Sequence, residues 1–400
     1  MAYMEQYRAK KMRRVAILIE LSSGYGEGII RGIGRYAKAV QNWQCDGIVP
    51  GRTTLLDLRR DPPEGMLFTC RNKEFAMAAA TLRGPIVDVV DIYNWPGHKQ
   101  PRRVTADDAA AGRLAAQHLL GCKLKHFALV GDFDMPWTQR RMEGFAAELH
   151  AANLEPLYFN SAKYPHKAWL AAHWLAASES LQSWLAALPK PIGLLGANDL
   201  WALRVLDGCR RRGIRVPEEA AVLGVGNDPL FCDLAQPPLS SIAIDLERVG
   251  YEAAALLDRL MAGRTTTDRH ILIPNRGLIT RQSTDILAVS DSAVIEAVRF
   301  IRATGGRGIS VSHVLGHVRL PRRALERRFR KLLNRGIDEE IRRVRMERVK
   351  DLLRETDLPL KAIAPRSGFS SIASLSTAFH QAIGMTPRQY RLQFRIMDAI

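Results

Sequence analysis

The segment that most constrains this chain is Pro321-Arg-Arg-Ala-Leu-Glu-Arg-Arg-Phe-Arg-Lys331. It has the length of one short helix, and six of its eleven residues are Arg or Lys. Leu325 and Phe329 are four residues apart and therefore share one helical face, which can pack on a core while the basic residues face outward. Leu375 and Phe379 repeat this spacing further along the chain. Two such helices joined by a long connector predict a double helix-turn-helix arrangement that contacts double-stranded DNA.

The distribution of charge supports this prediction. The whole chain carries a net charge of +17. Residues 291–400 contain 22 Lys or Arg against 11 Asp or Glu, so this last part of the chain holds +11 of that charge. A positive field concentrated in one region favours a polyanion as partner, and nucleic acid is the usual one.

The cysteines and the apolar segments indicate the compartment. The five cysteines are far apart, and no two have the CxxC spacing of a zinc or redox site. This pattern is typical of a reducing cytosol. No run of about 18 apolar residues occurs, and the basic start of the chain lacks the features of a secretory leader. We therefore expect a cytoplasmic protein without a membrane span.

Residues 14 to 281 alternate short apolar runs with longer amphipathic segments. We expect strands in the runs 14–21, 65–69, 85–92, 126–131, 191–196 and 220–226. We expect helices at 28–40, 108–120, 139–150, 168–187 and 200–212. Strand–helix alternation predicts parallel sheets covered by helices on both faces. The length is sufficient for two α/β lobes with a cleft between them.

In open parallel sheets, ligands bind beyond the carboxyl ends of the strands. Polar and aromatic residues follow several of the expected strands, and they can offer hydrogen bonds and a stacking face to a small polyol. The candidates are Ser22, Tyr25, Trp137, Asn198, Asp199, Asn227 and Asp228. Asp199 has a second interpretation, as the N-cap of the helix expected from Leu200.

We expect neither a cofactor nor a metal ion. The glycines of Gly24-Tyr-Gly-Glu-Gly28 lie at every second position, which differs from the GxGxxG pattern of dinucleotide-binding loops. His313 and His317 are four residues apart, but no third metal ligand is evident. Two alternatives remain open at this point: a sugar-modifying α/β enzyme with a basic tail, and a periplasmic solute-binding protein.

The tail contains the helices that two helix-turn-helix units require. We expect an entry helix at 293–305, a first unit at 310–331, a connecting helix at 337–356 and a second unit at 358–383. Pro321 suits the first position of the first recognition helix. Ser370 or Ser371 can cap the second one, after a turn at Gly368.

Two stretches of the tail resemble a known family. GFSSIASLSTAFHQAIGMTPRQYR is similar to the signature of the AraC-type transcription regulators, and LPRRALERRFRKLLNRGI resembles their first recognition helix. The preceding region resembles the LacI-type sugar-sensing domain, which is itself similar to periplasmic binding proteins. In this order, and over nearly the whole chain, the combination resembles regulators of xylose operons.

The resemblance implies a fold and a function. It implies a two-lobed periplasmic-binding-protein-like sensor domain at 1–285 and an all-α AraC-type DNA-binding domain at 286–400. The protein would be a transcription regulator, an activator and not an enzyme. It would respond to a small sugar in the interlobe cleft, with xylose as the sugar that the resemblance suggests. It further implies a homodimer and a contact with RNA polymerase.

The resemblance also implies roles for individual residues. Arg323, Glu326 and Arg327 match positions that face bases in the major groove. The positions expected to hold phosphates or protein acids are Arg322, Arg328, Arg330 and Lys331. In the second unit the groove-facing positions are Ile372, Ala373, Ser376 and Thr377. Arg141 matches an arginine that donates to sugar hydroxyls in LacI-like sensors.

Four residues depart from the family pattern. Arg319 stands where a turn glycine is common, and we expect it in a helical or bridge conformation. Pro321 replaces a serine. Pro365 removes a backbone donor from the first helix of the second unit, and we expect it to shorten that helix. Gly226 stands where an aspartate is common, so we expect sugar recognition to shift to Asn227 or Asp228.

Overall fold

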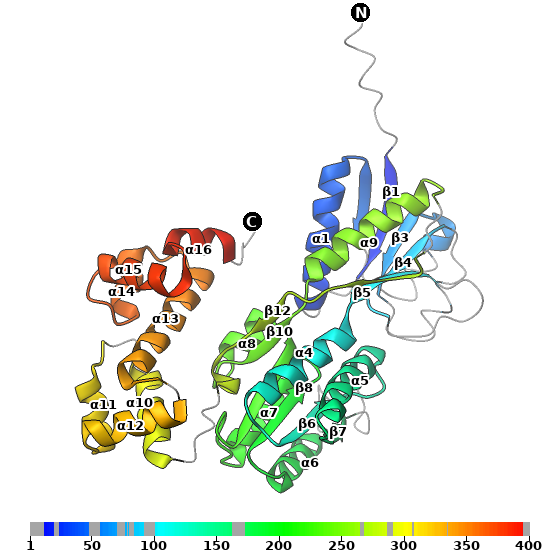
Figure 1. Cartoon of the computed structure of the whole chain (residues 1–400). Coiled ribbons are helices and arrows are strands. Elements are labelled where there is room, and N and C mark those ends of the chain that lie inside the picture. Colours follow the sequence, from blue (N-terminus) through cyan, green and yellow to red (C-terminus); the bar gives the residue numbers. More distant parts are fainter. Residues whose placement is uncertain are drawn as a thin grey trace, which may run out of the picture. The chain divides into compact units, whose positions relative to one another are not determined.

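The structure of the protein is a computed structural model (Figure 1). It describes residues 12–19, 24–47, 57–69, 77, 79, 84–91, 101–161, 173–264, 268–285, 291–305, 308–333 and 335–394. Contacts divide the chain into two compact units, Met1–Ile286 and Leu287–Ile400. Within the described residues, no helix has the length and apolar character needed to cross a membrane.

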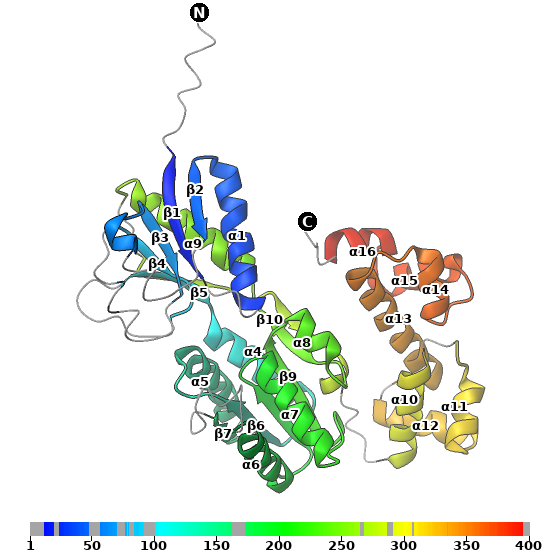
Figure 2. The same ribbon diagram turned by 180° about the vertical axis from the view of Figure 1, so that it is seen from behind.

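The first lobe of the N-terminal unit is built on a parallel sheet of six strands. Their order across the sheet is β11-β5-β4-β3-β1-β2. The strands are β1 (Arg13–Leu18), β2 (Trp43–Gly47), β3 (Gly65–Phe68), β4 (Ile86–Asp88), β5 (Arg102–Ala106) and β11 (His270–Ile273). Helices α1 (Gly24–Val40) and α9 (Leu246–Met261) pack against each other on this lobe (Figure 2). Their close approach requires glycine, because a Cβ on Gly32 would lie 1.9 Å from the Glu247 carbonyl oxygen.

The second lobe is also built on a six-stranded sheet, in the order β12-β10-β9-β8-β6-β7. Five strands are parallel, namely β6 (His126–Gly131), β7 (Leu157–Asn160), β8 (Ile192–Gly196), β9 (Ala220–Gly226) and β10 (Ser240–Ala243), and β12 (Gly277–Ile279) is antiparallel. The helices are α4 (Asp108–Gly121), α5 (Pro136–Ala151), α6 (His173–Ala187), α7 (Asp199–Arg211) and α8 (Pro229–Leu234), followed by the 3-10 helix η3 (Gln282–Thr284). The chain passes between the lobes after β5, β10 and β11, so three segments form the hinge.

The α/β architecture expected from the sequence is confirmed, and its first helix begins earlier than expected. Helix α1 begins at Gly24, four residues before the expected start at residue 28, so the glycine-rich segment 24–28 forms its first turn. Gly28 and Gly32 lie on the face of α1 that meets α9, where a Cβ on Gly28 would lie 2.7 Å from the Leu246 Cβ. Their small size therefore serves helix packing.

The C-terminal unit consists of seven helices in its described residues. They are α10 (Ser292–Thr304), α11 (Val311–Val318), α12 (Arg322–Leu333), α13 (Ile337–Glu355), α14 (Leu360–Arg366), α15 (Ile372–Ile383) and α16 (Pro387–Phe394). Leu325 and Phe329 of α12 lie in one buried cluster with α10, and Leu375 and Phe379 of α15 lie in a second with Tyr390. Helix α13 contributes to both clusters, so the two helix-turn-helix units that the sequence predicts share one long helix.

The turns of the first unit differ from expectation. Arg319 has φ 55° and ψ 40°, the left-handed conformation, in place of the expected helical or bridge one. It ends α11 by donating its backbone N–H to the Leu315 carbonyl at 2.9 Å, as glycine does at many helix ends. Pro321 precedes α12 and does not occupy its first position, and its carbonyl accepts from the N–H groups of Ala324 and Leu325.

The proline of the second unit lies in the last turn of its helix. Helix α14 continues one residue past Pro365 to Arg366, and Ser367 N–H still reaches the Ile363 carbonyl at 3.0 Å. Because the missing donor lies near the helix end, the turn keeps its shape. Gly368 follows with φ 76°, and Ser371 caps α15 by accepting from Ser374 N–H.

Candidate nucleic-acid interface and ligand cleft

Helix α12 has a basic outer face held in place by its buried side. Leu325 and Phe329 have no exposed surface. The exposed side chains on the other side are Arg322, Arg323, Arg327, Arg330 and Lys331. Among the described residues, none of these five forms an ion pair or a side-chain hydrogen bond. A helix with unpaired guanidinium groups on its outer face can hold phosphates and the O6 and N7 atoms of guanine.

Two charged residues of α12 have protein partners. Glu326 was expected to face bases, but its carboxylate accepts from the backbone N–H of Ile337 at 3.4 Å and lies beside Gly336. It therefore supports the N-terminus of α13, where a negative charge is favourable. Arg328 donates to both carboxylate oxygens of Asp291, at 3.2 and 3.0 Å, which ties α12 to the start of α10.

Helix α15 presents a different outer face. Ile372, Ala373 and Thr377 are exposed, and Ser376 is partly buried. Ile372 keeps 45% of its surface exposed although it is apolar. Short, uncharged side chains can contact thymine methyl groups and fit the shape of a groove, but they cannot make the bidentate contacts of arginine.

In the N-terminal unit, Arg141 lies at the centre of a buried polar cluster. Only 4% of this residue is exposed. Its guanidinium pairs with Asp108 through Nε and Nη2, at 2.9 and 2.8 Å, and Nη1 donates to the Ala197 carbonyl at 2.5 Å. The Trp137 ring lies 4.9 Å from the guanidinium carbon, which is a cation–π distance. Arg141 thus connects α4, α5 and the end of β8.

Tyr25 of α1 belongs to the first lobe but lies near this cluster. Burial is the main reason that the pKa of its hydroxyl is raised, and the negative charge of Asp108 adds to the effect. Arg141 acts in the opposite direction. The hydroxyl therefore stays protonated and can donate a hydrogen bond near Asp108 and Arg141.

The residues after β8 and β9 form a second polar cluster. Asn198, and not Asp199, caps α7 by accepting from Trp201 N–H at 2.9 Å. Asp199 is buried, and its carboxylate accepts from Ser241 Oγ at 2.5 Å and from Asp228 N–H at 2.8 Å. Burial raises the pKa of Asp199, while these two hydrogen bonds lower it. Asp199 thus fixes the loop that carries Asp228.

The other candidates lie around this loop. Asn227 has φ 55° and its side-chain oxygen accepts from Arg281 Nη1 at 2.9 Å. The Asp228 carboxylate reaches the first lobe, because a Cβ on Gly24 would lie 2.5 Å from its Oδ2 atom. A Cβ on Gly226 would lie 2.8 Å from Asp199 Oδ2, so the Asp199 carboxylate fills the space next to residue 226. Ser22 lies outside the described residues.

Sequence reasoning missed a group of charged residues at the lobe boundary. They are Asp88, Asp91, Arg103, Asp108 and Arg140. Burial raises the pKa of Asp88 to about 6, and two backbone N–H groups and Arg103 act in the opposite direction. The two aspartates that interrupt the apolar run 85–92 were the available signal. Across the part of the chain that the structure describes, no group of three His, Cys, Asp or Glu residues could hold a metal ion.

Comparison with known proteins agrees with this organisation. A family model of a periplasmic binding protein-like domain matches residues 116–284, and a helix-turn-helix model matches residues 315–393. The chain is 30% identical to the xylose operon regulatory protein of Haemophilus influenzae, covering 95% of this chain and 98% of that protein. It is 28% identical to the corresponding protein of Escherichia coli strain K12, with 95% and 97% covered.

The solved structures extend the comparison. The structure of the xylose-binding transcription activator XylR matches with a TM-score of 0.75 and 26% identity, covering 96% of this chain and 99% of that one. A complex of the transcriptional regulator CelR with cellobiose matches over 68% of this chain and 85% of that one, with a TM-score of 0.55 and 23% identity. At this identity the second match supports the fold alone.

Proposed function

This chain belongs to the family of the xylose operon regulatory proteins, and on this premise we propose which molecules it recognises and with which residues. Residues 1–285 bind a small sugar in the interlobe cleft, with xylose the first candidate, because regulators of xylose operons match nearly the whole chain. Residues 286–400 bind operator DNA. The protein acts in the cytoplasm as an activator that contacts RNA polymerase, since the matching XylR is described as a transcription activator.

One observation carries the DNA-binding half of this proposal. Helix α12 exposes five basic side chains that have no acidic partner among the described residues. Basic side chains clustered on one face of a recognition helix, without acidic neighbours, favour an external polyanion. Arg323 and Arg327 would read bases, and Arg322 and Arg330 would hold phosphates. The contacts of α15 would come from Ile372, Ala373, Ser376 and Thr377.

The proposed sugar contacts come from both lobes. Tyr25 would donate its hydroxyl from α1, and Asn198, Asn227 and Asp228 would contribute from the loops after β8 and β9. Arg141 keeps N–H groups beyond those used by Asp108 and Ala197, and Trp137 would provide an apolar face. Asp199 would act by holding Asp228, whose carboxylate reaches the first lobe next to Gly24. Ser22 remains a proposed contact.

Helix α4 offers a physical route from the cleft to the DNA-binding region. Asp108 at its N-terminus pairs with Arg141. At its other end His118 Nε2 lies 2.8 Å from Thr284 Oγ1, and Cys122 Sγ lies 3.6 Å from the Thr284 carbonyl. Thr284 ends the 3-10 helix two residues before the boundary of the first unit. A sugar that moves the lobes would thereby move the segment that leads to the DNA-binding helices.

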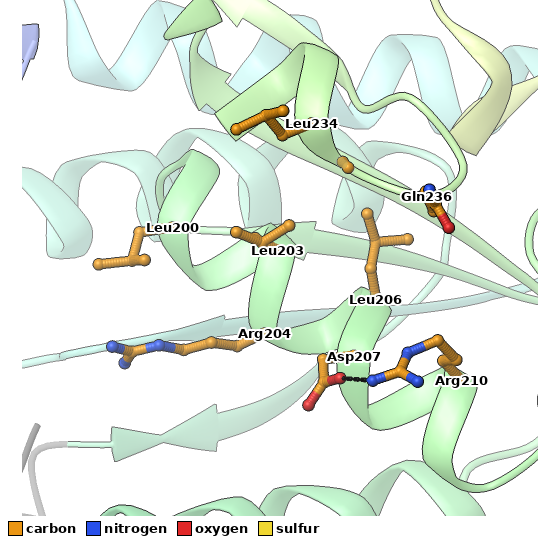
Figure 3. Close-up of a pocket in the computed structure, with 9 residues that line it drawn as sticks. Leu200, Leu203, Arg204, Leu206, Asp207, Arg210, Leu234 and Gln236 are labelled. Atoms are coloured by element: carbon orange, nitrogen blue, oxygen red, sulfur yellow. Dashed lines mark hydrogen bonds and ion pairs between the residues drawn. The ribbon is translucent and has the colours of Figure 1, made fainter. Parts of the chain in front are cut away.

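A groove on α7 and α8 supports the proposed homodimer. Its volume is about 650 Å³, and Leu200, Leu203, Leu206 and Leu234 line it together with Arg204, Asp207 and Arg210 (Figure 3). Leu234 is 77% exposed and Leu230 beside it is 69% exposed. Asp207 pairs with Arg210 and Arg211 of the same chain, so the groove has an apolar centre and a polar rim, the arrangement that a two-fold interface with a second copy requires.

The dimer is tested by sedimentation of the full chain. Leu234→Glu places a charge in the apolar centre and should shift the protein to monomers. Leu392→Glu on α16 changes a leucine of the same 77% exposure and should leave the mass unchanged. A wild-type protein that sediments as a monomer at all concentrations would remove the dimer from the proposal.

The sugar and the DNA are tested together. A panel of pentoses and hexoses is added in a thermal melt, and a bound sugar raises the melting temperature without being consumed. DNA upstream of the neighbouring genes is titrated with and without that sugar.

Tyr25→Phe should weaken sugar binding. Tyr36→Phe on the same helix is the control and should not weaken it, because Tyr36 packs on Trp43 and Tyr251. Turnover of the sugar would favour the enzyme alternative instead.

A further inference from the structure

Asp91 joins the two lobes of the N-terminal unit. It follows β4 in the first lobe, and its two carboxylate oxygens meet two different arginines. Oδ1 lies 3.1 Å from Nε of Arg103 on β5, in the same lobe. Oδ2 accepts a hydrogen bond of 3.0 Å from Nη1 of Arg140 on α5, in the other lobe. One carboxylate therefore bridges the boundary at which the lobes would separate.

The turn that carries Asp91 is held firmly. The Asp88 carboxylate accepts from the backbone N–H groups of Val90 and Asp91 through Oδ1, at 3.1 and 3.3 Å. Asp88 itself has no exposed surface, and its Oδ2 atom has no hydrogen-bond partner. Asp91 has φ 52°, in the left-handed region that Asp and Asn adopt more readily than most residues. The backbone position of Asp91 is thus held by Asp88, and its carboxylate is held by the two arginines.

In the second lobe, the helix that carries Arg140 is also firmly packed. Helices α4 and α5 pack at backbone distance, because a Cβ on Gly112 would lie 2.0 Å from the Arg141 carbonyl oxygen and one on Gly144 the same distance from that of Ala109. Arg140 also lies 3.6 Å from Asp108 on α4. Because the backbone of α5 is fixed against α4, a separation of the lobes that exceeds the reach of the Arg140 side chain breaks its bond with Asp91.

The ion pair between Asp91 and Arg140 has little exposure to solvent. The Asp91 side chain is 10% exposed and that of Arg140 is 26% exposed. Salt screens such a pair less than it screens two groups on an open surface. Opening exchanges the attraction between the two charges for their hydration, so the bond favours closed lobes where the attraction exceeds the gain from hydration.

We propose that Asp91 and Arg140 form an interlobe clasp that favours closed lobes and so tunes sugar affinity through closure and not through contact with the sugar. The proposal rests on the sugar-sensing function above. A ligand that binds closed lobes has an apparent Kd that rises as the closed fraction falls. Asp91 and Arg140 are therefore positioning residues, and their removal should weaken any ligand that requires closure.

The experiment measures closure directly, without any sugar. Fluorophores are placed at Lys38 on α1 and Ala147 on α5, both exposed, through non-natural amino acids in the full chain. Single-molecule energy transfer then reports the distance between the lobes. Asp91→Asn and Arg140→Gln should each raise the open fraction. Glu219→Gln, which breaks an ion pair with Arg215 inside one lobe, is the matched control and should change nothing.

A double-mutant cycle tests whether the two residues act through each other. The double variant Asp91→Asn with Arg140→Gln should raise the open fraction no further than either single variant does, because each single variant already breaks the bond. Each single variant should weaken xylose binding by about 5- to 10-fold, a coupling of the size common between sites. If the effects of the two single variants add in the double variant, or if the single variants leave the distance distribution unchanged, the clasp is refuted. If wild type binds no xylose, the sugar assignment fails, but the distance measurement still decides the clasp.

Discussion

The two recognition helices bury equivalent residues but expose surfaces of different charge. Positions 321–330 and 371–380 show the same order of exposed, partly buried and buried residues, fifty positions apart. Helices α12 and α15 each have 12 residues, and each buries a Leu and a Phe four residues apart. Yet α12 contains six basic residues and one acid, whereas α15 contains no residue with a permanent charge.

This comparison shows that the residues that orient a recognition helix are distinct from the residues that are available to contact DNA. Two buried side chains are enough to orient a short helix, because they fix the face that packs on the core. The exposed positions are then free to differ, and Arg323 and Arg327 correspond to Ala373 and Thr377. We expect α12 to supply most of the electrostatic attraction and the guanine readout, and α15 to sense thymine methyl groups and groove shape.

The largest expected effect tests the shared framework. Phe329→Ala and Phe379→Ala each empty a fully buried site and should each cost about 3–5 kcal/mol in local stability. Because the two phenylalanines lie in separate clusters, hydrogen exchange should accelerate mainly in α10 to α12 for the first variant and in α14 to α16 for the second. Equal acceleration in both halves by either variant would contradict the comparison.

The next effect tests the difference in readout. Arg327→Ala should weaken binding to the cognate DNA by about 1–3 kcal/mol and relax the base preference at its position. Thr377→Ala, at the corresponding position of α15, should cost less than about 1 kcal/mol. Gel-shift titrations against a set of single-base variants measure both. An unchanged affinity and base preference for Arg327→Ala would reject its assignment to a base.

A smaller effect follows from moving charge between the helices. Ala373→Arg together with Thr377→Arg gives α15 two of the basic positions of α12. If both arginines reach phosphates, the slope of log affinity against log salt should become steeper by about 1.8, because each phosphate contact adds about 0.9. Binding at several salt concentrations measures the slope. An unchanged slope would mean that the outer face of α15 does not approach the DNA backbone.

The smallest effect concerns the turns. Arg319 is left-handed at the end of α11, a conformation that costs about 1 kcal/mol for most residues other than glycine. Arg319→Gly should therefore stabilise the first unit by up to about 1 kcal/mol. Gly384, at φ 78°, ends α15 in the same way, and Gly384→Ala should destabilise the second unit by a similar amount. Thermal unfolding of the full chain compares the two variants.

Much of this architecture was predictable because it rests on periodicity. Leu325 and Phe329 predicted the buried face of α12, and Leu375 and Phe379 did the same for α15. The strands at 126–131 and 191–196 were evident as continuous apolar runs, which parallel strands buried on both faces require. The short strands β2, β7 and β12 carried no such signal, since several of their residues are only partly buried or exposed.

The sequence alone therefore determined which residues of this protein face a core and where its basic charge is concentrated, since both follow from composition and from spacing along a single element. Only the tertiary structure decided the partners of individual polar groups: that Glu326 supports α13, that Asp199 holds the loop of Asp228, and that Asp91 meets Arg140. The reason is physical. A hydrogen bond or an ion pair depends on distances of about 3 Å between atoms that lie far apart in the chain, and local periodicity contains no information about those distances.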